Sequence, residues 1–69
     1  MNKTPYHYEI PANGEKLKSR QYETIEQCIE ACKAECKELG ANYDDRDVKL
    51  FMTDSDGVWE VTEEGELAG

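Results

Sequence analysis

Thr24–Gly40 reads TIEQCIEACKAECKELG, and this stretch decides the fold. Its apolar residues and cysteines recur three and four residues apart, which places them on one face of an α-helix. Thr24 with Gln27 fits a capping box at the start, and Gly40 suits a left-handed cap at the end. The sequence therefore predicts one amphipathic helix that must cover its apolar stripe against other elements. The stripe consists of Ile25, Cys28, Ile29, Cys32, Cys36 and Leu39.

A hairpin is predicted before this helix. Tyr6–Ile10 alternates aromatic and β-branched residues, which is typical of a strand. Asn13-Gly14 is the strongest short hairpin signal, because both residues tolerate a positive φ. The second strand is expected over roughly residues 16–21, and the register brings apolar side chains together on one face. The expected pairs are Ile10 with Leu17, Glu9 with Lys18, Tyr8 with Ser19 and His7 with Arg20.

A second hairpin is predicted after the helix, from strands at Val48–Thr53 and Val58–Thr62. Asp54–Gly57 between them has the composition of a turn. A four-residue loop pairs Met52 with Trp59, whereas a two-residue loop at Asp56-Gly57 places Asp54 opposite Trp59 and fits less well. We therefore expect Trp59 to be buried, together with Ile29, between the helix and the sheet.

These elements predict an α+β fold, with one helix packed on a mostly antiparallel four-stranded sheet in the order ββαββ. Residues 1–69 form a single domain, and residues 1–4 and 63–69 are expected to be mobile. The second and third strands, which the helix connects, should run in the same direction. The order of strands within the sheet stays open.

The charge distribution predicts a basic partner. The net charge is −8, and residues 23–69 carry fourteen acids against four bases, a balance of −10. Such a field repels nucleic acid and attracts basic surfaces. We expect the binding surface on the solvent side of the helix and in the loop after it. The candidate partner-binding residues are Glu26, Glu30, Asp44, Asp45 and Asp47.

The three cysteines, Cys28, Cys32 and Cys36, suggest a metal or redox site that their spacing does not favour. Two thiolates one turn apart can share a metal, but the third lies about 12 Å from the first. The usual two close pairs of zinc ligands are missing, and His7 is the only histidine. An odd number of cysteines also fits a disulfide framework poorly. We expect buried free thiols in a reducing cytoplasm, with no metal and no cofactor.

Other chemical signals are weaker still. Asp54–Gly57 with Glu63 resembles part of a calcium loop, but Met52 would then occupy the first ligand position. A nucleophile cannot be placed beside His7, so no enzymatic activity is expected. The sequence contains no apolar run of 18 residues, and its first residues lack the apolar stretch of a signal peptide. We therefore expect no contact with a membrane.

The pattern of the chain resembles small bacterial and phage domains of the strand–strand–helix–strand–strand type. The resemblance comes from Tyr22 and Thr24 before the Cys/Ala-rich helix, from Val48–Met52 and from Asp56–Trp59. Some of these domains are anti-CRISPR inhibitors that act by binding. The resemblance implies a stoichiometric adaptor or inhibitor without catalysis, directed at a basic nucleic-acid-handling protein. The alternative is a nucleic-acid-binding domain that uses the outer sheet face, with Lys16, Lys18, Arg20 and Phe51.

Overall fold

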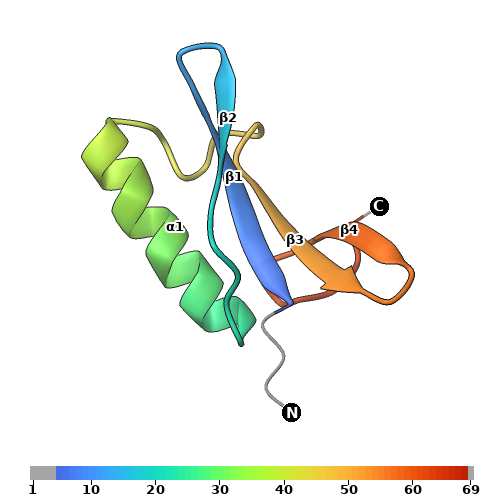
Figure 1. Cartoon of the computed structure of the whole chain (residues 1–69). Coiled ribbons are helices and arrows are strands. Elements are labelled where there is room, and N and C mark those ends of the chain that lie inside the picture. Colours follow the sequence, from blue (N-terminus) through green and yellow to red (C-terminus); the bar gives the residue numbers. More distant parts are fainter. Residues whose placement is uncertain (1–4, 69) are drawn as a thin grey trace.

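A computed structural model describes residues 5–68 as an antiparallel sheet with a helix on one face (Figure 1). The elements are β1 (Tyr6–Ala12), β2 (Glu15–Lys18), α1 (Ile25–Leu39), β3 (Lys49–Asp54) and β4 (Gly57–Val61). The strand order is β2-β1-β3-β4. Because β2 and β3 both pair antiparallel with β1, they run in the same direction, as predicted. The predicted α+β class and ββαββ order are confirmed. Residues 1–4 and 69, which we expected to be mobile, lie outside the described residues.

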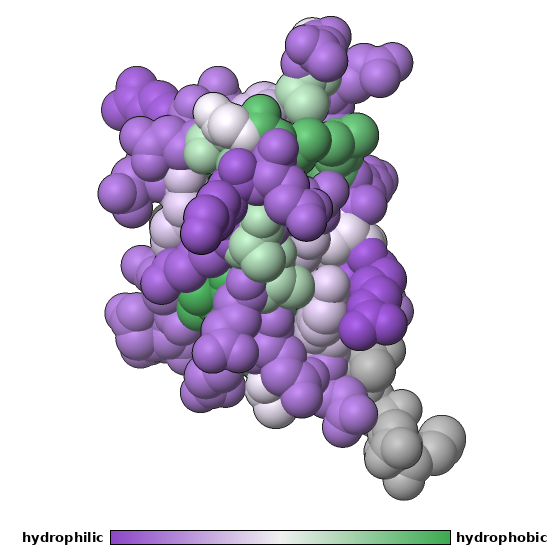
Figure 2. All heavy atoms as spheres, turned by 90° about the vertical axis from the view of Figure 1, so that its left-hand side faces the viewer, coloured by the Kyte–Doolittle hydropathy of each residue, from purple (hydrophilic) through white to green (hydrophobic). Residues whose placement is uncertain are grey.

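The helix begins and ends where its caps predict. Thr24 Oγ1 accepts a hydrogen bond from the N–H of Gln27 at 3.1 Å, and Gly40 has a φ of 72°. The stripe is buried at Ile25 and at all three cysteines, but Ile29 is half-buried and Leu39 is exposed. The buried stripe is therefore narrower than the sequence pattern. Figure 2, which faces α1, shows that its solvent side is mostly hydrophilic.

The first hairpin has the predicted turn and register. Asn13 and Gly14 adopt φ values of 53° and 81°. Ile10 pairs with Leu17 and Glu9 with Lys18. This register places Ile10, fully buried in the central strand β1, on the face that α1 covers.

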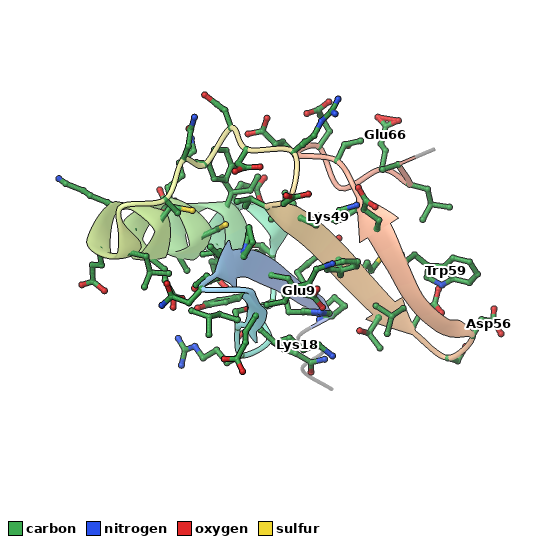
Figure 3. All side chains as sticks on the ribbon, turned by 90° about the horizontal axis from the view of Figure 1, so that it is seen from above. Glu9, Lys18, Lys49, Asp56, Trp59 and Glu66 are labelled. Atoms are coloured by element: carbon green, nitrogen blue, oxygen red, sulfur yellow. The ribbon has the colours of Figure 1, made fainter. Side chains whose placement is uncertain are left out.

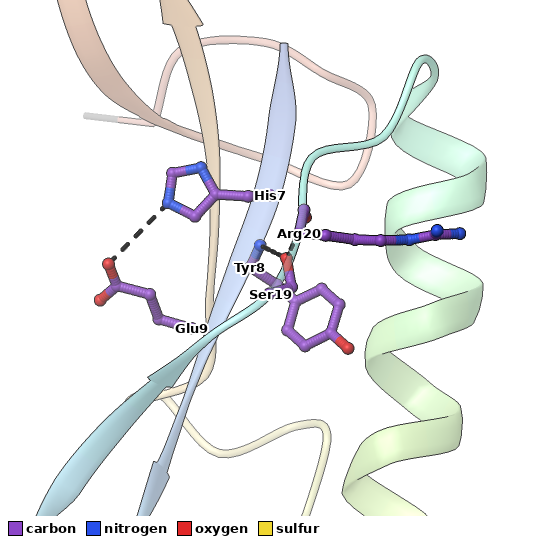
Figure 4. Close-up of polar contacts among 5 residues, drawn as sticks. All are labelled: His7, Tyr8, Glu9, Ser19 and Arg20. Carbon is purple, nitrogen blue, oxygen red and sulfur yellow. Dashed lines mark hydrogen bonds and ion pairs between the residues drawn. The ribbon is translucent and has the colours of Figure 1, made fainter. Parts of the chain in front are cut away.

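The chain leaves this register after Ser19, and the position predicted for Arg20 is wrong. The N–H of Tyr8 donates to Ser19 Oγ at 2.9 Å, and Tyr6 then pairs with Tyr22. From Tyr8 to Tyr6 the chain moves two residues, whereas from Ser19 to Tyr22 it moves three, so one residue is extra. Arg20 consequently lies over the Tyr22 ring, 5.1 Å from its centroid, on the side of α1 (Figure 4).

The second hairpin also has the predicted register, with Met52 opposite Trp59. Pairing continues to Asp54 and Gly57, so the turn contains two residues rather than the four that we predicted. Asp54 Oδ1 accepts hydrogen bonds from the N–H groups of Asp56 at 2.7 Å and Gly57 at 3.1 Å. The carboxylate therefore holds the turn together, and the predicted hairpin is confirmed.

Trp59 is not buried, contrary to our prediction. It shares the helix-side face with Met52, but 43% of its surface is exposed. The strand order explains this difference, because α1 packs mainly on β1 while β4 lies two strands away. The core therefore lies beneath the helix. It comprises Tyr8, Ile10, Ile25, Cys28, Cys32, Cys36, Leu50 and Val61.

Residues 62–68, which we call the C-terminal return, fold back along β4. Thr62 N–H donates to Glu66 O at 2.7 Å, and Ala68 N–H donates to Glu60 O at 3.0 Å. Gly65 lies against Tyr6 and Ile25 at the start of α1. The segment after residue 62, which we expected to be mobile, is thus hydrogen-bonded through residue 68. Thr62 Oγ1 also accepts backbone hydrogen bonds within the turn of this segment.

Candidate functional site

A groove of about 370 Å³ lies between the loop that follows α1 and the C-terminal return. We call it the acidic groove. Its floor is apolar and is formed by Val48, Leu50, Val61 and Ala68. Its rim is polar and consists of Tyr43, Asp44, Asp45, Lys49, Glu60, Thr62 and Glu63.

Side-chain hydrogen bonds fix the loop that forms one wall of the acidic groove. Asn42 Oδ1 accepts from the N–H of Asp44 at 3.0 Å, and Asp45 Oδ1 accepts from the N–H of Asp47 at 2.9 Å. Asn and Asp favour such turns because their short side chains reach the backbone two residues ahead. The Asp44 and Asp45 side chains are therefore presented at the rim by a hydrogen-bonded loop.

Tyr43 connects the two walls of the acidic groove. Its hydroxyl donates to Glu63 Oε2 at 3.0 Å, and Lys33 Nζ of α1 lies 5.2 Å from its ring centroid. Burial raises the pKa of Tyr43, and the bond to Glu63 raises it further. The hydroxyl therefore stays protonated at neutral pH and remains a donor to the Glu63 carboxylate.

The groove carries a net negative charge. Asp44, Asp45, Glu60 and Glu63 contribute four negative charges and Lys49 one positive charge, a sum of −3. Lys49 Nζ lies 3.5 Å from Glu60 Oε1, so this cation is already paired at the outer edge (Figure 3 labels Lys49). An apolar floor beneath a rim with a net negative charge suits the aliphatic stem and charged head of a Lys or Arg side chain.

The structure separates the five residues that we predicted to bind a partner. Asp44 and Asp45 line the acidic groove, and Asp47 lies exposed in the same loop but does not line it. Glu26 and Glu30 are exposed on α1, on the flank that they share with Lys33 and Lys37 at helical spacing.

Among the groove residues that sequence reasoning missed are Tyr43, Glu60 and Glu63. Glu63 was assigned to a mobile tail, and the return that brings it to Tyr43 leaves no periodic signal. Glu60 could have been placed at the rim from the strand alternation, but only once β4 was known to be an edge strand.

The outer sheet face carries part of the basic row expected for nucleic acid. Lys16, Lys18 and Lys49 lie on this face, whereas Arg20 does not. The rings of His7 and Phe51 stack on each other, with centroids 5.1 Å apart and planes at 16° (Figure 4 shows His7). One face of each ring is therefore covered by the other ring, whereas proteins that bind single-stranded nucleic acid leave ring faces free to stack on the bases.

The three thiols are held in the core rather than at a surface. Cys28 and Cys32 are fully buried and Cys36 is 2% exposed. Burial raises the pKa of Cys28 to about 11 and that of Cys32 to about 12. Since the thiolate is the reactive form, these thiols react slowly in the folded protein.

We expect the cysteines to react slowly with a chromogenic thiol reagent at pH 8 in the folded protein. Complete and rapid reaction of all three is expected in guanidinium chloride, because unfolding exposes them and restores their ordinary acidity. The release of chromophore over time measures both rates. Fast labelling without denaturant would contradict the burial described here.

Comparison with models of protein families, with curated proteins and with solved structures finds no match for this chain. Within residues 5–68, no helix has the length and apolar character needed to cross a membrane.

Proposed function

We propose that this chain is a small acidic protein-interaction module that binds a basic surface of another protein and catalyses no reaction. The acidic groove is the observation that carries this proposal. A Lys or Arg side chain of the partner can lay its stem on Val48 and Val61 and place its charge among Asp44, Asp45 and Glu63. Charge-assisted hydrogen bonds of this kind are stronger than neutral ones.

The charge of the whole molecule supports the same partner class. A net charge of −8 on 69 residues attracts a basic protein over several ångströms and speeds its association. The resemblance to anti-CRISPR-type inhibitors makes a nucleic-acid-handling protein the partner that we propose, because such proteins carry basic surfaces. The complex would be stoichiometric, and the buried thiols suit a reducing compartment such as the cytoplasm.

Paired charge reversals test which acidic surface binds. Asp44→Lys/Glu63→Lys changes the groove charge by four, from −3 to +1, and Glu26→Lys/Glu30→Lys changes the charge of the helix flank by the same amount. We expect the groove variant to lose capture of a basic protein from lysate, with affinity for the identified partner lowered about 10-fold or more. The helix variant should retain most binding.

Salt provides the second readout, since exposed charges are screened over about 8 Å at 0.15 M. Binding of the unmodified chain should weaken between 0.05 and 0.3 M salt, and circular dichroism should show both variants folded. Equal loss in the two variants would mean that only total charge matters and would contradict a role for the groove.

The rival function, binding of single-stranded nucleic acid, is supported by Lys16 and Lys18 on the outer sheet face. It predicts that Lys16→Ala/Lys18→Ala lowers oligonucleotide affinity and the slope of its salt dependence. Micromolar binding of the unmodified chain to an oligonucleotide at 0.15 M salt would contradict the protein-interaction proposal.

A further inference from the structure

Three apolar side chains, two of them exposed and one partly buried, form a patch on the helix-side face of β3, β4 and the C-terminal return. We call Met52, Trp59 and Leu67 the Trp59 patch. Met52 and Trp59 are cross-strand partners, and Leu67 pairs with Val61, which shares their face. Trp59 is 43% exposed and Leu67 is 64% exposed. Figure 3 shows Trp59 on β4 at the opposite end of the sheet from α1.

The Trp59 ring is exposed but held in place. Its Nε1–H donates to Asp54 Oδ1 at 3.1 Å, the oxygen that also accepts from the backbone of the turn. These bonds lower the pKa of Asp54, so the acceptor stays charged. A large aromatic side chain that is already ordered loses little entropy on binding, which is the property of an interface anchor.

The patch is bordered by acids. Asp54 contacts Trp59 directly, and Asp56 lies in the turn at the tip of the same hairpin. Figure 3 shows Asp56 near Trp59 at this end of β4. An apolar centre within an acidic border complements an apolar stripe that has lysine or arginine along its sides.

We propose that the Trp59 patch is a docking site for a basic amphipathic helix of the partner protein, with Trp59 as its anchor. This inference rests on the proposed function and identifies a second contact surface beyond the acidic groove. The sheet explains why a helix fits. Helix α1 packs mainly on β1 and leaves Trp59, near the hairpin end of β4, exposed, so a second helix can pack over this end of β3 and β4.

Two other occupants fit less well. An added strand would need the open edge of β4, but the C-terminal return already takes Glu60 O through Ala68 N–H. A second copy of the chain would bring another net charge of −8 against the same acidic border.

A synthetic leucine–lysine peptide of 18 residues, with leucines on one helix face, is the probe for this site. Trp59 is the only tryptophan, so its fluorescence reports on the patch alone. We expect micromolar binding at 0.15 M salt and a shift of the emission to shorter wavelength as the indole is desolvated. A leucine–glutamate peptide and a serine–lysine peptide of equal length should produce neither effect.

Variants of adjacent residues provide the matched control, with the anisotropy of a labelled leucine–lysine peptide as the readout. Trp59→Ala should weaken binding about 30-fold, the usual effect of losing an anchor, and Leu67→Ala should weaken it less. Val58→Ala should bind normally, because Val58 is 57% exposed but lies on the opposite face of the same strand. Circular dichroism of each variant checks the fold.

Several outcomes would overturn the inference. One is no binding of the leucine–lysine peptide at 100-fold excess over the protein. Another is equal weakening by Trp59→Ala and Val58→Ala. Equal affinity for the serine–lysine peptide would show that charge alone binds. A further outcome is that Asp44→Lys/Glu63→Lys abolishes binding of the leucine–lysine peptide, while the peptide leaves the Trp59 emission of the unmodified protein unchanged. That outcome would refute the patch but leave the proposed function intact.

Discussion

Above pH 9 the protein is expected to lose stability steeply, by about 5 kcal/mol within two pH units. The cause is the group of buried thiols. Burial raises the pKa of Cys28 from 9.0 to about 11 and that of Cys32 to about 12, and it also raises the pKa of Cys36. The unfolded chain ionises these groups first. It therefore binds fewer protons than the folded chain between pH 9 and pH 11, and stability falls as pH rises.

The size of this loss is comparable with the whole stability of a small domain. Each buried thiol contributes about 1.4 kcal/mol per pH unit between its two pKa values. Cys28 and Cys32 together therefore remove about 5 kcal/mol by pH 11, against a total of roughly 5–15 kcal/mol for ordinary domains. Burial also raises the pKa values of Tyr8 and Tyr43, which adds to the loss above pH 10.

Thermal unfolding followed by circular dichroism from pH 7 to pH 11 tests this expectation. Cys32→Ala supplies the control, because it removes one titrating thiol. Its starting stability will be lower, but its stability should fall less steeply above pH 9, by about 1.4 kcal/mol per pH unit. A melting temperature that stays constant from pH 9 to pH 11 would show that the thiols ionise freely in the folded state.

The second large effect is expected for Ile10→Ala, which should destabilise the fold by about 2–5 kcal/mol. Ile10 is fully buried in β1, the strand on which α1 packs. Removing its outer carbons leaves a cavity between sheet and helix, which adds to the lost burial of apolar surface. Urea denaturation measures the change as a lower midpoint with the same slope.

Ile29→Ala removes the same atoms and is the matched comparison. From the sequence alone we expected a loss of about 2–5 kcal/mol at Ile29. The structure places that side chain at the edge of the core, where it is only partly buried, and so the cost should be smaller than at Ile10. A greater loss at Ile29 than at Ile10 would contradict the packing of α1 on β1.

Local sequence signals predicted the elements well. Asn13-Gly14 set the register of the first hairpin because only a turn with two positive φ values joins the strands there. Thr24 and Gly40 set the ends of α1 through hydrogen bonds within a few residues. Each of these features depends on neighbours in the chain, and the sequence pattern therefore contains them.

Features that depend on distant residues were not predicted. Alternation placed Trp59 on the correct face but could not show that α1 covers β1 and leaves β4 open. Arg20 lies on the helix side of the sheet and not on the predicted outer face, because Ser19 Oγ replaces a backbone hydrogen-bond partner and one extra residue follows. The acidic groove combines Asp44 and Asp45, which were predicted, with Glu63, which only the C-terminal return brings near. The sequence pattern did not contain the strand order. It also did not show that the Ser19 hydroxyl replaces a backbone hydrogen-bond partner.

The central position of β1 also governs how the fold assembles during translation. One of its neighbours, β2, follows β1 directly in the chain. The other, β3, comes much later, so that Tyr6 pairs with Met52. Thirty residues separate Lys18, the end of β2, from Lys49, the start of β3. At about 5–20 residues per second, β3 is therefore synthesised roughly 2–6 seconds after β2. Until β3 pairs with it, the second edge of β1 has unpaired backbone groups that another strand could bind.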